Sequence, residues 1–152
     1  MPERVVLSDA STLIGLSSID ALHLLKDLYG RVEVTTIVQD EASVMTPWLI
    51  VNDSYDSTVF RSLASRLDNG EASAIALALT QENCLLIIDE RKGRRQALAL
   101  GLKITGLVGV IIKAKERGLI DSGKDKLDEL LVRGFRLSPK IYTLALKRMQ
   151  ED

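Results

Sequence analysis

The chain has 152 residues and a formal net charge of −1, with 46% hydrophobic and 27% charged residues. This composition is ordinary for a soluble globular protein, and the length predicts a single domain over residues 1–152. The lone cysteine, Cys84, excludes an intrachain disulfide and fits a reducing compartment. No apolar run approaches the roughly 18 residues of a membrane span, and the N-terminus lacks a signal-peptide pattern. We therefore expect a cytoplasmic protein without a membrane segment.

Short apolar runs alternate with amphipathic segments along the chain. The runs that predict strands are residues 4–9, 32–35, 48–51 (at a sheet edge), 84–89 and 103–105. Ser11 or Thr12 is expected to cap the first helix, and a second runs from about Ala21 to Gly30. Asp56 and Ser57 are expected to cap the fourth, and a turn at 68–70 precedes the fifth. The helices predicted by range are 37–44, 71–81, 91–100, 107–117, 124–133 and 139–150. This alternation, with nearly continuous apolar strands, predicts a three-layer α/β/α sandwich with a mostly parallel central sheet.

Four acidic residues lie where different segments deliver side chains to one end of this sheet. Asp9 and Asp89 close two of the apolar runs. Glu41 lies in the helix after the second run, and Glu71 opens an Ala-rich helix. Ligands of parallel sheets bind outside the carboxyl ends of the strands. Converging carboxylates repel one another unless a cation holds them, and hard oxygen ligands suit Mg²⁺ or Mn²⁺. The alternative is that these acids only cap helices or favour their N-termini.

Basic residues are concentrated directly after this acidic part. Residues 1–89 carry 13 Asp or Glu and 5 Lys or Arg, whereas residues 90–117 carry 2 and 8. Arg91, Arg94 and Arg95 follow Asp89, and Thr105 lies at the end of a strand. Such a segment suits contacts to a nucleic-acid backbone, with the Thr105 hydroxyl as a further donor to phosphate. A solvated amphipathic helix is the alternative reading of the arginines.

Other classes of site lack their signatures. The chain has no Gly-x-x-x-x-Gly-Lys-Ser/Thr sequence, which argues against a P-loop enzyme. His23 is the only histidine and has no cysteine near it in the sequence, which argues against a zinc site or a Ser-His-Asp triad.

The order and spacing of these motifs resemble those of the PIN-domain nucleases, including the VapC-like toxin ribonucleases. The matching segments are residues 5–14 around Asp9, Glu41, 70–78 around Glu71, 85–95 around Asp89, 101–109 and 134–138. The last two fit one poorly characterised PIN branch especially well. The resemblance implies that Asp9, Glu41, Glu71 and Asp89 form a catalytic, metal-binding quartet, and that Ser11 contacts a water or a phosphate oxygen.

The resemblance implies a function as a Mg²⁺- or Mn²⁺-dependent endoribonuclease acting on single-stranded RNA, as the toxin of a toxin–antitoxin pair with an antitoxin partner. The chain departs from the family pattern at two positions. Glu71 stands where many members have Asp, and Ile87 where many have Ser or Thr. These departures bear on the number and geometry of bound metals. The alternative is a PIN-like binding module for nucleic acid or protein whose carboxylates no longer catalyse.

The resemblance also implies a homodimer, for which the early helices give independent support. Their apolar residues occupy more than the roughly 100° stripe that one core-facing helix requires. These residues are Leu13, Ile14, Leu16, Ile19, Leu22, Leu24, Leu25 and Leu28. The alternative is that all eight are buried within one subunit.

Overall fold

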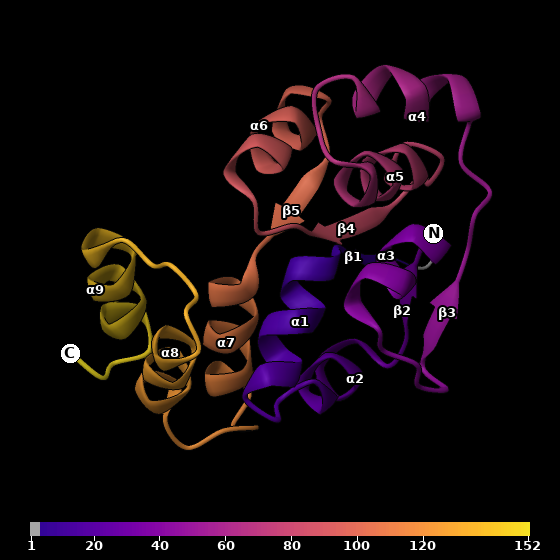
Figure 1. Ribbon diagram of the computed structural model, residues 1–152. Coiled ribbons are helices and arrows are strands. Elements are labelled where there is room, and N and C mark those ends of the chain that lie inside the picture. Colours follow the sequence, from indigo (N-terminus) through magenta and orange to yellow (C-terminus); the bar gives the residue numbers. More distant parts are fainter. Residues whose placement is uncertain (1–3) are drawn as a thin grey trace.

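The computed structural model describes residues 4–152, which contain a five-stranded sheet (Figure 1). All four strand pairings are parallel. The spatial order is β3 (Leu49–Val51), β2 (Val32–Val34), β1 (Val5–Ser8), β4 (Cys84–Ile87) and β5 (Lys103–Thr105). The five predicted strands are confirmed, and β3 lies at an edge of the sheet as expected. Because β1 and β4 pair at the centre, the residues that follow them emerge side by side.

Helices cover both faces of the sheet. Figure 1 shows α4, α5 and α6 on one side and α1, α2 and α7 on the other, with α8 and α9 packed beyond α7. The helices are α1 (Ala10–Ser18), α2 (His23–Tyr29), α3 (Thr36–Ala42), α4 (Ser57–Ala64), α5 (Asn69–Ala78), α6 (Arg91–Ala99), α7 (Leu107–Glu116), α8 (Gly123–Val132) and α9 (Pro139–Arg148). The predicted three-layer α/β/α architecture is confirmed. None of the helices among the described residues is both long and apolar enough to cross a membrane.

Two helix starts differ from the prediction: an aspartate rather than a hydroxyl residue caps α1, and α5 begins at Asn69, within the predicted turn. Asp9 is the N-cap of α1 and its side chain accepts a hydrogen bond from the Thr12 N–H, so the helix begins before Ser11. Asp68 is the N-cap of α5, so the predicted turn at 68–70 is the first helical turn. A carboxylate at the N-cap satisfies an otherwise unpaired backbone N–H and opposes the positive end of the helix dipole.

The apolar residues of the first two helices lie mostly within the core. Six of the eight named for a dimer interface are buried, and Leu22 is half-buried. Ile14 is 40% exposed. The core of one subunit therefore accounts for nearly all of the apolar excess that suggested an interface. The homodimer remains a prediction that rests on the resemblance.

Candidate active site at the carboxyl edge of the sheet

Asp9 joins the ends of the two central strands. It follows β1 directly and is only 2% exposed. Its Oδ1 accepts the Thr12 N–H at 2.9 Å, and its Oδ2 accepts the Asp89 N–H at 2.8 Å. Burial raises the pKa of Asp9 to about 6, although these hydrogen bonds oppose the shift. The backbone thus holds the Asp9 carboxylate in one orientation beside Asp89.

Glu71 is a buried carboxylate with an unpaired oxygen. It lies in the first turn of α5 and is 8% exposed. Among the described residues, no hydrogen-bond partner reaches its Oε1. A Cβ at Gly93 of α6 would lie only 3.2 Å from this oxygen, so the glycine leaves room for the carboxylate. Burial, and then the charges of Asp68, Glu90, Asp9 and Glu41, raise the pKa of Glu71 to about 7.

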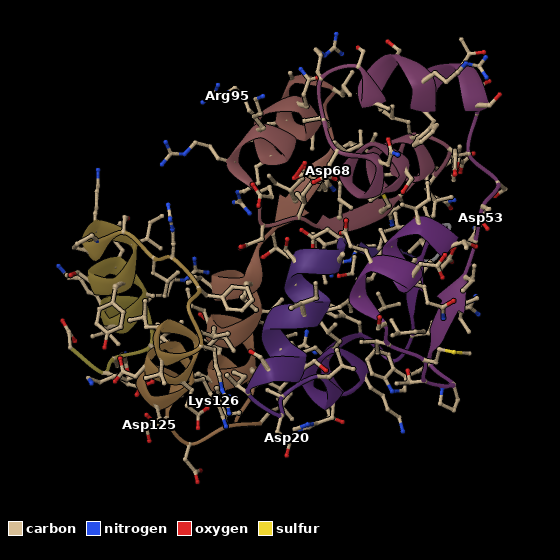
Figure 2. All side chains as sticks on the ribbon, viewed as in Figure 1. Asp20, Asp53, Asp68, Arg95, Asp125 and Lys126 are labelled. Atoms are coloured by element: carbon tan, nitrogen blue, oxygen red, sulfur yellow. The ribbon has the colours of Figure 1, made fainter. Side chains whose placement is uncertain are left out.

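Glu41 reaches the start of α5 from α3. A Cβ at Gly70 would lie 3.1 Å from Glu41 Oε2 and 3.6 Å from Asp68 Oδ1. Partial burial, and then the charge of Asp68, raise the pKa of Glu41. Asp68, which the sequence pattern assigned to a turn and which Figure 2 labels, therefore also belongs to this cluster, as does Glu90, because the charges of both raise the pKa of Glu71. The position of Asp68 three residues before Glu71, a common spacing for an N-cap, was the signal that could have identified it.

Asp89 lies between β4 and α6 in the sequence, and its side chain reaches the N-terminus of α7. It comes two residues after the end of β4, because the strand ends at Ile87 rather than at residue 89. Its Oδ1 accepts the Leu107 N–H over a long 3.4 Å. Asp89 also contributes its negative charge to the raised pKa of Asp9. Strand β4 and helix α7 thus bring the Asp89 carboxylate to the same edge as Asp9.

Electrostatic interactions therefore connect the four predicted acids. Asp9 interacts with Asp89, and Glu71 interacts with both Asp9 and Glu41. Over residues 4–152, however, no three or more Asp, Glu, His or Cys side chains stand close enough together to hold a metal ion. The carboxylates form a mutually repelling cluster rather than an assembled ligand set.

The predicted phosphate contacts fall into different environments. Ser11 is half-buried in the first turn of α1. The Thr105 hydroxyl is directed against Gly109 in the first turn of α7. Arg91 and Arg95 are exposed on α6, and Figure 2 shows Arg95 extending away from the sheet. Arg94 is half-buried instead, and its Nη1 donates to the Ile88 carbonyl at 2.9 Å. Arg94 therefore occupies a different environment from Arg91 and Arg95.

The chain is therefore an α/β/α sandwich with an acidic cluster at the carboxyl edge of its parallel sheet. A family model described as a PIN domain matches residues 5–151, and the chain belongs to this family. PIN domains are generally nucleases and typically use divalent metals. Neither a curated protein nor a solved structure matches the chain.

Proposed function

We propose that this protein is a divalent-metal-dependent ribonuclease that hydrolyses phosphodiester bonds in single-stranded RNA. The observation that carries the proposal is the buried Glu71 oxygen without a hydrogen-bond partner among the described residues, inside a cluster of four further carboxylates. Burying an unpaired carboxylate oxygen destabilises a fold, so such a group calls for a ligand. The preference for RNA over DNA rests on the resemblance to the toxin ribonucleases.

The residues present fit a hard divalent cation in their chemistry. Asp9, Glu41, Glu71 and Asp89 offer only carboxylate oxygens, which Mg²⁺ and Mn²⁺ prefer over nitrogen or sulfur ligands. Burial is the main cause of the raised pKa values of Asp9 and Glu71, and a cation would offset the repulsion between carboxylates that adds to it. Because no ready-made ligand set stands among the described residues, binding requires these side chains to move closer together.

Each residue then has a distinct part in the reaction. When bound, a divalent cation supplies an activated water near neutral pH and neutralises charge on the phosphate. The Thr12 and Asp89 backbone N–H groups keep Asp9 in a fixed orientation beside the cation site. Asp89, which follows the adjacent strand β4, would offer the cation a second carboxylate. Arg91 and Arg95, exposed on α6, contact the RNA backbone and add affinity without sequence preference.

A cleavage assay tests the proposal. Labelled single-stranded RNA is incubated with the protein in Mg²⁺, in Mn²⁺ and in excess EDTA, with Asp89→Asn as the control variant. We expect cleavage only with the metals and only by the wild-type protein. Full activity in EDTA, or undiminished activity of Asp89→Asn, would refute the mechanism. Equal cleavage of RNA and DNA would remove the preference for RNA.

A toxin role within a toxin–antitoxin pair is the biological setting that the resemblance favours, with an antitoxin as the partner protein. Induced expression in a bacterial host tests it. We expect growth arrest by the wild-type protein and normal growth with Asp89→Asn. Normal growth in both cases would leave a ribonuclease without a toxin function.

A catalytically inactive binding module is the second candidate. Both Asp9 oxygens already accept backbone N–H groups, and the acids do not form an assembled ligand set among the described residues. An inactive module would bind RNA without cleaving it in either metal. It would also show no thermal stabilisation by Mn²⁺, whereas a metal site would be stabilised in proportion to its occupancy.

A further inference from the structure

Arg94 holds its guanidinium inside the carboxyl edge of the sheet. Its Nη1 donates to the Ile88 carbonyl at 2.9 Å, next to the start of α7. A Cβ at Gly106 would lie 2.6 Å from this nitrogen and 3.5 Å from Asp89 Oδ1. The guanidinium and the Asp89 carboxylate therefore flank the same glycine. Any side chain at residue 106 would displace the arginine.

Arg94 forms no ion pair within 4.0 Å with an acidic side chain in the described part of the chain, although Asp89 flanks the same glycine. The hydrogen bond that fixes it goes to a neutral carbonyl. A guanidinium has five N–H donors, so this bond leaves most of them available to a ligand. A half-buried cation with free donors beside a carboxylate is suited to an anionic ligand.

We propose that Arg94 binds the phosphodiester group that is cleaved, donating its free N–H groups to a non-bridging oxygen beside Asp89. This inference rests on the proposed ribonuclease function and names the residue that receives the phosphate. A polyanion would otherwise be repelled by the acids of the cluster, and Arg94 supplies positive charge beside one of them, Asp89. Arg91 and Arg95 differ because they are exposed and contact flanking backbone only.

Four variants test whether Arg94 contacts the cleaved phosphate or has only a structural role. Arg94→Ala removes the guanidinium, and Arg94→Lys keeps the charge without the planar set of donors. Gly106→Ala keeps Arg94 but displaces its guanidinium, and the extended backbone at residue 106 (φ −128°) accepts alanine. Arg31→Ala is the matched control, since it removes an exposed arginine next to the amino end of β2.

Two readouts are measured for each variant. The first is the single-turnover cleavage rate with enzyme in excess, in Mn²⁺. The second is the affinity for a short fluorescein-labelled 2′-O-methyl oligonucleotide across a salt titration in EDTA, which withholds the metal that cleavage requires. We expect Arg94→Ala to lose about a hundredfold in rate and about tenfold in affinity. Its salt slope should fall by about 0.7, as for one phosphate contact on a single strand. Arg94→Lys and Gly106→Ala should lose rate in the same direction, and Arg31→Ala should match the wild type.

The outcomes distinguish this inference from the proposed function. If Arg94→Ala melts at a lower temperature but keeps the affinity and salt slope of the wild type, the residue is structural and the inference is overturned. Wild-type cleavage rates in Arg94→Ala would overturn it as well, while the ribonuclease would stand. If the wild type does not cleave RNA in Mn²⁺ but Arg94→Ala still loses affinity and salt slope, the ribonuclease fails and Arg94 stands as a phosphate ligand.

Discussion

Replacing Glu71 by glutamine should change how the stability of the metal-free protein depends on pH. The pKa of Glu71 rises from its ordinary value of 4.5 to about 7 in the fold. The native state therefore binds more protons than the unfolded chain between these values, and its stability falls as pH rises through that window. Below about pH 4.5 the contribution is fully present, and above about pH 7 it is lost. Because glutamine does not titrate, the Glu71→Gln variant should not lose this stability as pH rises.

The magnitude follows from the two pKa values. At about 1.4 kcal/mol for each factor of ten in proton affinity, the complete loss is about 3.5 kcal/mol. Between about pH 5 and about pH 8 the expected difference is about 2.5 kcal/mol. Glu71 is 8% exposed, but three of the acids that raise its pKa are exposed, so solvent screening makes this figure an upper value. Any cost of burying the amide in place of the protonated acid is the same at both pH values and cancels in the comparison.

Urea unfolding in EDTA at these two pH values measures the effect. Between about pH 5 and about pH 8, wild-type stability should fall more than that of Glu71→Gln, by up to about 2.5 kcal/mol. Glu82→Gln is the matched control, since Glu82 is exposed and precedes β4 at the opposite edge of the sheet. The stability of Glu82→Gln should depend on pH in the same way as that of the wild type. The same pH dependence in wild type and Glu71→Gln would refute the inferred burial of an unpaired carboxylate.

Three further outcomes are expected. Asp9→Asn should lower the free energy of unfolding by about 1–3 kcal/mol, since an amide cannot accept both backbone N–H groups through two oxygens. Unchanged stability would contradict the role of Asp9 as the cap of α1, and this cost is why Asp89→Asn is the cleaner variant for activity. Replacing Arg91 and Arg95 together by alanine should lower the salt slope of RNA binding by about 1.4, at about 0.7 for each lost contact. An unchanged slope would make them a solvated helix face. In sedimentation at micromolar concentration we expect a species near twice 16.7 kDa, and a single species at 16.7 kDa would exclude the dimer.

Local patterns in the sequence predicted the order of strands and helices along the chain better than they predicted contacts. The strands and helices of residues 4–152 followed from apolar runs and from stop signals such as Gly30, because these are local properties. The errors at the starts of α1 and α5 arose where an aspartate serves at once as cap and as member of the acidic cluster. A cap and a ligand have the same sequence signature, so only the fold separates them.

The side-chain arrangement at the carboxyl edge was out of reach of the sequence for a different reason. Arg94 and Arg95 are adjacent and chemically identical, yet Arg94 donates to the Ile88 carbonyl just after β4 and Arg95 is exposed. This difference depends on how α6 packs against β5 and α5, which no local pattern records. The same holds for the spacing of the acids, which lie near one another without forming a metal-ligand group among the described residues.

Three glycines at helix starts explain how so many charged groups fit at one edge. Gly70 in α5, Gly93 in α6 and Gly106 at the N-cap of α7 each face a charged side chain from another element. A Cβ at these positions would lie 3.1 Å from a Glu41 oxygen, 3.2 Å from a Glu71 oxygen and 2.6 Å from an Arg94 nitrogen, respectively. Larger residues there would force the charged groups apart. The candidate site is therefore specified by where side chains are missing as well as by where charges are placed.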